Sequence, residues 1–120
     1  MPVLSHYNNI RPYQTLDGSE IREIMHPQVH GNTRQSLAQA IVKPGETTQL
    51  HRHHKSEELY FITQGKGNMQ LGHERLIVKE GDCICIPSGT AHNIQNTGDE
   101  HLIILCCCSP AYSHDDTELL

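Results

Sequence analysis

The chain has 120 residues, a formal net charge of −5 at pH 7 and 36% hydrophobic residues, which fits one domain with its own core. An acidic chain without a Lys/Arg cluster argues against binding to nucleic acids or anionic membranes. No apolar run approaches the ~18 residues of a membrane span. Ten residues are histidines, which directs the search to metal binding.

Five cysteines occur without any CxxC pair. Cys83 and Cys85 are two residues apart, and Cys106 to Cys108 are consecutive. Such close neighbours rarely form disulfides with one another. The first nine residues lack a basic region followed by an apolar stretch, so we expect reduced thiols and a cytoplasmic location. Both groups lie in runs typical of strands, where we expect cysteine to fill core volume; a thiolate metal cluster is the alternative.

Residues 1–20 contain Pro2, Asn8, Asn9, Pro12 and the pair Asp17-Gly18, which predict an irregular arm that covers a sheet edge or crosses to a partner. Short β-branched runs follow, separated by Gly, Pro and Asn turns. The predicted strands are Ile21–Met25, Leu37–Val42, Thr47–His53, Glu58–Thr63, Gly67–Leu71, Arg75–Val78, Cys83–Ile86, Ala91–Gln95 and Leu102–Cys107. Strands at this spacing indicate an all-β sandwich or barrel in a single domain, 1–120, with its core in 34–108. We expect 109–120 to be a solvated surface tail.

The segment from His51 to Glu58 carries the clearest chemical signal. On a strand, His51 and His53 share one face, and a turn after them can bring Glu58 back beside both. Two neutral imidazoles and a carboxylate suit a divalent metal ion. His92, at the start of a later strand, is the best candidate for a further ligand.

Two spaced motifs contain these residues. The first has the spacing G(X)5HXH(X)4E(X)6G, and the second has the spacing G(X)5PXG(X)2H(X)3N. Their fixed positions are Gly45, His51, His53, Glu58 and Gly65, then Gly81, Pro87, Gly89, His92 and Asn96. Through these positions the chain resembles a small single-domain (type 2) member of the cupin superfamily.

That resemblance implies a conical jelly-roll β-barrel of two antiparallel sheets. It also implies one divalent metal ion, with manganese or iron favoured over nickel or zinc, held by His51, His53, Glu58 and His92. Glu57 is the competing carboxylate, because it satisfies a shorter gap from His53. Spacing to Gly65 favours Glu58.

Strand alternation predicts which side chains face the metal. We expect Gln49, Ile62, Ile94 and Met69 in a substrate cavity, with gap-filling core packing as the alternative for Met69. Tyr60 is a candidate proton donor, and its alternative is an aromatic that packs in the barrel. The other histidines are expected at the surface or in support of the ligands: His6, His26, His30, His54, His73, His101 and His114. Arg22 and Arg34 are candidates for anion binding, with a solvated face as the default.

The resemblance does not fix the reaction. The leading hypothesis is a small metalloenzyme acting on an oxygen-bearing small molecule, by dioxygenase-like oxidation or by isomerase-like chemistry, with a lyase next. The alternatives are a cupin that binds a sugar or small acid without turnover, and a storage barrel whose metal only stabilises the fold. We also expect a homodimer in which arm residues such as Ile10 and Tyr13 pack on the partner.

Overall fold

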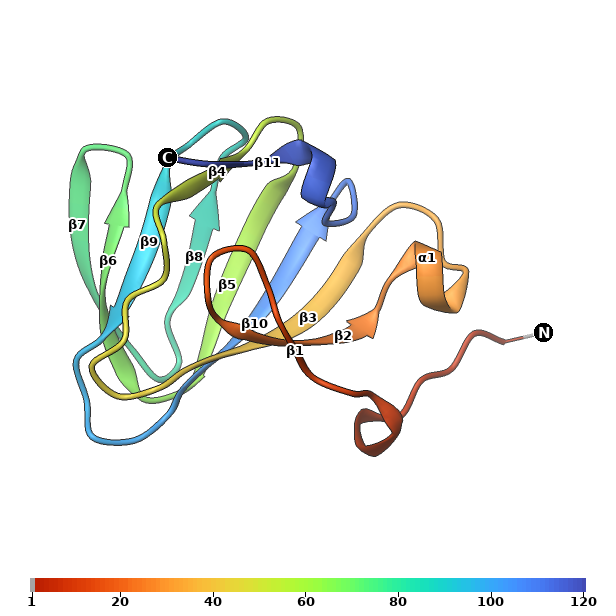
Figure 1. The fold of residues 1–120 in the computed structure, drawn as a ribbon, viewed down its shortest axis with the longest axis horizontal. Helices are drawn as coiled ribbons and strands as arrows, with labels where there is room; N and C mark the ends of the chain where they lie inside the picture. Colours follow the sequence, from red (N-terminus) through yellow and green to blue (C-terminus); the bar gives the residue numbers. More distant parts are fainter. Residues whose placement is uncertain (1) are drawn as a thin grey trace.

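The computed structural model describes residues 2–120 and is built mainly of strands (Figure 1). The strands are β1 (Tyr13–Gln14), β2 (Glu20–Met25), β3 (Ser36–Val42), β4 (His51–His53), β5 (Glu57–Gln64), β6 (Lys66–Leu71), β7 (Glu74–Lys79), β8 (Cys83–Ile86), β9 (His92–Asn96), β10 (Leu102–Ser109) and β11 (Thr117–Leu119). The short helices are the 3-10 turn η1 (Tyr7–Asn9), the helix α1 (Pro27–His30) and the 3-10 turn η2 (His114–Asp116). None of the helices in this part of the chain has the length and apolarity to cross a bilayer.

The strands form two antiparallel sheets. One has six strands in the order β1-β2-β3-β10-β5-β8, and the other has five in the order β11-β4-β9-β6-β7. The chain passes repeatedly from one sheet to the other, so sequence neighbours such as β5 and β6 lie in different sheets. This confirms the predicted all-β, jelly-roll architecture.

The hydrophobic core lies between the two sheets. Strands β3, β5 and β10 alternate buried positions with half-buried or exposed ones, which places every second side chain in the interior. Its fully buried members come from both sheets: Ile62, Met69, Ile86, Ile94, Leu102 and Ile104. Burying a side chain of this size stabilises the fold by about 1.5–3 kcal/mol.

Gly67 of β6 shows how closely the chain packs around this core. A Cβ atom there would lie 2.6 Å from the Gln95 carbonyl oxygen and 3.2 Å from side-chain atoms of Ile94 and Leu102. Only glycine lets the two strands pack at this distance.

The predicted strands match the observed ones closely, with one shortened. The run Thr47–His53 forms only β4 and an isolated bridge between Thr47 and Gln95. The chain ends are more ordered than expected. Residues 13–14 pair with β2, and β11 pairs along the whole of β4. The predicted solvated tail is therefore corrected: it contributes a strand to the five-stranded sheet.

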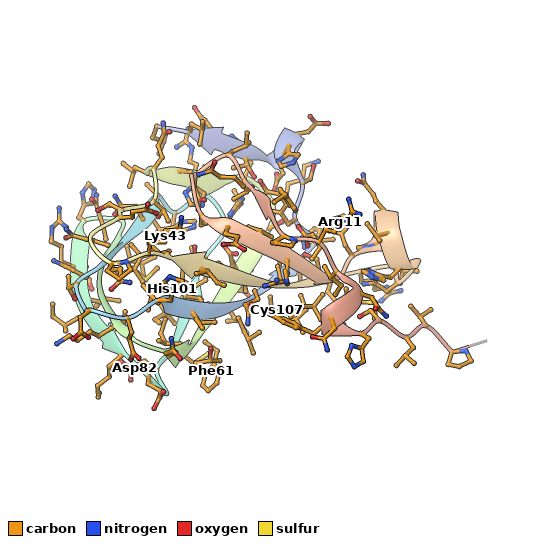
Figure 2. The ribbon with its side chains drawn as sticks, turned by 60° about the horizontal axis from the view of Figure 1, so that its bottom comes forward. Arg11, Lys43, Phe61, Asp82, His101 and Cys107 are labelled. Atoms are coloured by element: carbon orange, nitrogen blue, oxygen red, sulfur yellow. The ribbon has the colours of Figure 1, made fainter. Side chains whose placement is uncertain are left out.

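The outer face of the six-stranded sheet corrects a second expectation. Cys83 and Cys85 are exposed, while Ile84 and Ile86 between and after them are buried. Phe61, opposite Cys83 in β5, is also exposed and projects from the ribbon in Figure 2. The core-filling role holds for Cys106 and Cys108 and fails for Cys83 and Cys85, because the alternating strand turns its isoleucines inward.

Candidate metal centre

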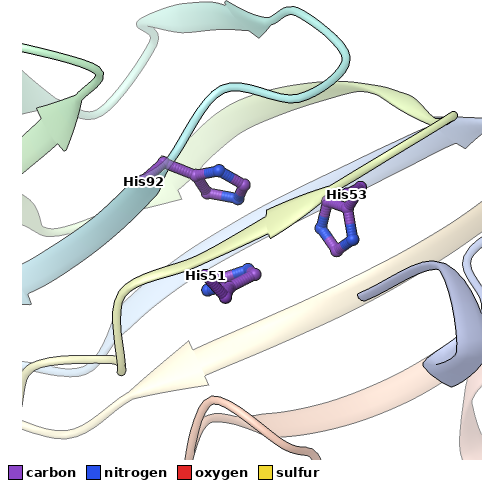
Figure 3. Close-up of side chains that lie close together, drawn as sticks. All are labelled: His51, His53 and His92. Atoms are coloured by element: carbon purple, nitrogen blue, oxygen red, sulfur yellow. The ribbon is translucent and has the colours of Figure 1, made fainter. Parts of the chain in front are cut away.

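Strands β4 and β9 bring three histidines together inside the barrel (Figure 3). His51 and His53 are two residues apart on β4 and both are buried, as alternation requires. His92 lies directly opposite His51 in the β4–β9 pair, and their ring centroids are 4.2 Å apart. One nitrogen from each ring lies within 4.8 Å of the others, so the group can hold a metal ion.

Each Nδ1 atom has a hydrogen-bond partner that fixes the proton. His51 Nδ1 lies 2.8 Å from the Gln49 carbonyl oxygen, and His92 Nδ1 lies 2.9 Å from that of Thr90. A carbonyl can only accept, so in each neutral ring Nδ1 carries the proton. Nε2 then keeps a free lone pair, as a metal ligand requires.

His53 reaches the same state through a side chain. Its Nδ1 lies 2.9 Å from Thr117 Oγ1, and that hydroxyl donates to the Ser113 carbonyl oxygen at 2.8 Å. Because its proton is committed to Ser113, the hydroxyl accepts from His53 Nδ1. The partner is 64 positions away in sequence and comes from β11.

Glu58 is the carboxylate that faces this group. Its Oε1 lies 3.2 Å from His53 Nε2 and 3.5 Å from His92 Nε2, and the residue is 5% exposed. Glu57, one position earlier on β5, is exposed on the opposite face. Strand alternation therefore favours Glu58 over Glu57 as the fourth ligand.

The residues present fit a metal ion. His92 Nε2 and Glu58 Oε1 are both buried without a hydrogen-bond partner among residues 2–120. Leaving such atoms unpaired in a low-dielectric interior is unfavourable, and a shared cation satisfies both at once. Three imidazole nitrogens and one carboxylate oxygen are also a common donor set for divalent transition metals.

Burial and mutual charge set the protonation of the site. Burial, and then the neighbouring His92, lower the pKa of His51 below its ordinary 6.5, which favours the neutral ring. Burial alone raises the pKa of Glu58, but its interactions with the neighbouring His53 and His92 side chains outweigh this and lower it to about 2. Burial, followed by the Glu58 charge, raises the pKa of Tyr60 well above 10, so Tyr60 stays protonated.

A cavity opens from the histidines toward the six-stranded sheet. Small side chains of β3 and β10 create the space, since Ser36, Ala38, Cys106 and Cys108 all line it. The volume of the cavity that the centre of a water molecule can occupy is about 50 Å³. One water needs ~10–15 Å³ by this measure, so the cavity holds a few water-sized groups.

The predicted lining is only partly observed. Ile94 and Tyr60 line the cavity, and the Tyr60 ring lies edge-on to His92 at 5.9 Å between centroids. Ile62 and Met69 are fully buried and belong to the hydrophobic core instead. Gln49 precedes β4, so strand alternation does not orient it, and its side chain is exposed. Only its main-chain carbonyl reaches the site, where it accepts the hydrogen bond from His51 Nδ1.

Both chain ends contribute cavity residues that the sequence analysis missed. Asp17, in the N-terminal arm, places Oδ2 3.9 Å from His51 Nε2. Tyr112, after β10, packs edge-on against the His53 ring at 5.7 Å between centroids. Glu23 of β2 and Thr117 of β11 also line the cavity. No short motif contains these residues, because the fold brings them from segments far apart in sequence.

Other motif positions support the strands that carry the ligands. Asn96 is 1% exposed and donates to the carbonyl oxygens of Val42 and Glu100, both at 2.8 Å. Gly89, with a φ of 78°, donates its N–H to the His53 carbonyl oxygen at 2.7 Å. The second motif thus holds the first in position at the main chain.

The remaining histidines and the candidate arginines have other roles. His6, His54, His73, His101 and His114 are exposed, as expected, and His30 is half-buried. His26 is buried, and none of its hydrogen bonds within residues 2–120 reaches a candidate ligand, so the expectation of a surface or ligand-supporting position is corrected. It caps α1 through Nδ1, and its Nε2 donates to the Tyr112 carbonyl oxygen at 2.7 Å. Arg22 contacts the Tyr7 hydroxyl and the Ile10 carbonyl, and Arg34 is exposed; neither lines the cavity.

Comparison with known families agrees with this geometry. The Cupin domain family matches residues 38–108, which include every motif position and all four candidate ligands. The chain belongs to the cupin family. The match leaves out the arm and β11, so the cupin core is completed here by segments outside the shared domain.

Three proteins similar to this chain carry different descriptions of their function. An uncharacterized protein of Methanocaldococcus jannaschii is 51% identical over 98% of this chain and 94% of its own. An oxalate-binding protein of Thermotoga maritima is 29% identical over 72% of this chain and 71% of its own. The Streptomyces protein Pac13, described as a nucleoside dehydratase, has a TM-score of 0.80 at 15% identity, covering all of this chain and 92% of its own; at that identity it shows the fold alone.

Proposed function

We propose that this cupin binds one divalent metal ion through His51, His53, Glu58 and His92, and that it acts on a small oxygen-bearing molecule in the adjoining cavity. The observation that carries the proposal is the shared state of the three imidazoles. Each commits Nδ1 to an acceptor and turns Nε2 into a buried space that already contains an unpaired carboxylate oxygen. Manganese or iron is favoured, with nickel or zinc as alternatives.

A bound divalent ion would polarise a substrate oxygen or lower the pKa of a coordinated water. The chain itself supplies the rest of the site. Tyr60, buried and kept protonated, is placed to donate a hydrogen bond rather than to act as a base. Tyr112 and side chains of the N-terminal arm line the cavity, so both chain ends contribute to its wall. Dioxygenase-like oxidation is the reaction class that we favour, with isomerase-like chemistry next.

A second candidate is binding without turnover. Its support is the relative named as an oxalate-binding protein, which matches 72% of this chain. Oxygen consumption with a panel of catechols, diketones and alkenes tests the dioxygenase-like reaction, and analysis of each bound ligand for conversion tests the isomerase-like one. Uptake with one of them supports the enzyme, whereas a thermal shift from a small ligand without any turnover supports the binder. A cytoplasmic location and a homodimer also remain proposals.

The metal site is tested by elemental analysis of protein purified without chelators. We expect close to one manganese, iron, nickel or zinc ion per chain. His92→Ala and Glu58→Gln should each lose most of it, because each removes a buried donor. The matched controls are His73→Ala and Glu57→Gln, which change exposed residues of the same types. Metal-free wild-type protein that also fails to take up these ions on titration contradicts the proposal.

A further inference from the structure

A second, more open hollow of about 350 Å³ adjoins the cavity beside the metal group. Tyr13, Glu23 and Tyr112 line both spaces and therefore lie at the boundary between them. A molecule that enters the inner cavity from this side passes these three residues. Only Glu23 among them carries a formal charge.

Glu23 has one oxygen engaged and one free. Its Oε1 accepts from the Tyr13 hydroxyl at 2.9 Å. Its Oε2 is buried without a hydrogen-bond partner among residues 2–120. The residue pairs with Ala38, which pairs with Cys106, so only small side chains separate it from Tyr60 along the sheet. A buried, unpaired carboxylate oxygen requires a donor, which a bound O–H or N–H group supplies.

The charges of the lining point the same way. Asp17, Glu23 and Glu58 line the inner cavity, and within the described chain neither Lys nor Arg lines the inner cavity or the outer hollow. A divalent ion offsets two of these three carboxylates and leaves a net charge of −1. Arg22, next to Glu23, is turned outward, where it contacts the Tyr7 ring and hydroxyl. Within residues 2–120, the site therefore offers no Lys or Arg side chain to pair with a carboxylate or phosphate of a ligand.

We propose that this cavity selects a neutral or cationic small molecule bearing hydroxyl or amino groups, such as a diol or an amino alcohol, and that Glu23 determines this preference. The inference rests on the proposed metal site, to which the same ligand presents an oxygen. Dicarboxylates and phosphate monoesters are disfavoured, because their charge meets Asp17 and Glu23 in a partly buried space. The ligand class thus differs from the oxalate named for the Thermotoga maritima relative.

The test compares three probes of equal chain length that differ in charge: 3-aminopropan-1-ol, propane-1,3-diol and 3-hydroxypropanoate. Each is titrated into zinc-loaded and zinc-free protein, with oxalate as a fourth probe, and binding is measured by NMR. We expect 3-aminopropan-1-ol to bind about tenfold or more tightly than 3-hydroxypropanoate, since opposite charges attract at low effective dielectric. In the zinc-free protein, which carries more net negative charge, the preference should be larger.

Glu23→Gln should reduce this ratio toward one, because it removes the charge and keeps the shape. Glu20→Gln is the matched control, since it removes the same charge from β2 at a position outside the cavity. Tyr13→Phe, which leaves the Glu23 charge in place, should keep the preference and guards against a folding defect of the first variant. Thermal unfolding confirms that each variant is folded.

Tighter binding of 3-hydroxypropanoate or oxalate in the zinc-free protein overturns the inference. An unchanged ratio in Glu23→Gln, or no binding of 3-aminopropan-1-ol, does the same. Zinc content, measured in parallel, separates the two proposals. Protein that fails to retain zinc contradicts the metal site, whereas zinc-loaded protein with the opposite charge preference contradicts only the ligand class.

Discussion

The Thr117 hydroxyl does for His53 what main-chain carbonyls do for His51 and His92. It accepts a hydrogen bond from His53 Nδ1–H, with 2.9 Å between nitrogen and oxygen, and so leaves Nε2 free. A hydroxyl acceptor is the more vulnerable arrangement, because a single side-chain substitution removes it, whereas a carbonyl belongs to the main chain.

Thr117→Val removes this acceptor while keeping the shape of the side chain. We expect metal affinity to fall about tenfold, the usual cost of losing the partner of a metal-bound imidazole. Competition with a chromogenic chelator measures the change. Thr117→Ser, which keeps the hydroxyl, should restore affinity. Equal affinity in the valine variant and wild-type protein would show that Thr117 does not orient His53.

At the residue scale, the sequence was most informative where spacing and alternation act together. The four candidate ligands could be predicted because strand alternation determines which side chains of a strand face inward. They are His51, His53, Glu58 and His92, and all four are buried. Alternation could not orient β8, because both faces of Cys83–Ile86 are apolar, and only the packed sheet shows that the isoleucines turn inward.

At the scale of elements, the end of the chain supports the turn between β4 and β5. The Asp116 carboxylate accepts the N–H groups of Lys55 and Ser56 at 2.9 and 3.1 Å, just before β11 pairs with β4. This turn separates His53 from Glu58, so its shape determines how the two ligands approach each other. The last strand therefore supports the metal group both through Thr117 and through this turn.

Asp116→Ala should lower the free energy of unfolding by about 1–2 kcal/mol near neutral pH, since it leaves two N–H groups without their acceptor. Burial alone raises the pKa of Asp116, but the N–H groups of Ser56 and Lys55 outweigh it and lower that pKa below the ordinary 3.8. A lowered folded-state pKa stabilises the protein above about 3.8, and this stabilisation is lost as the pH falls through the folded value.

Urea unfolding of the metal-free protein at pH 7 and at pH 3 measures both effects. The difference between wild type and Asp116→Ala should shrink at the lower pH. Asp115→Ala is the matched control, because Asp115 is an exposed neighbour of the same type, whereas the N–H groups of Lys55 and Ser56 bond to Asp116. A difference that grows on acidification would contradict this role for Asp116.

At the scale of the whole molecule, the site closes only when both ends of the chain are in place. Asp17 and Glu23 come from the first quarter of the sequence, and Tyr112 and Thr117 from the last residues. Sequence reasoning missed these residues for one physical reason. Their positions depend on how the arm and β11 pack on the sheets, and no local periodicity records that packing.

Metal binding should therefore stabilise the whole fold. A ligand that binds only the native state stabilises it by about 2.7 kcal/mol at one hundred times its Kd. We expect zinc or manganese to raise Tm by several degrees and EDTA to reverse the rise, as measured by calorimetry. His92→Ala should show no metal-dependent shift. A shift of equal size in that variant would place the binding elsewhere on the protein.

The opposite orientations of the cysteines in β8 and β10 give the protein a natural reporter of its own opening. Cys83 and Cys85 are exposed, whereas Cys106 and Cys108 face the interior, and burial raises the pKa of both inner thiols. An alkylating reagent therefore meets the exposed Cys83 and Cys85 and the half-buried Cys107 in the closed molecule, and it reaches the inner pair only after the sheets separate. The mass of the alkylated chain thus gives the number of thiols that have reacted, and so shows whether the interior of that molecule has opened, without any introduced label.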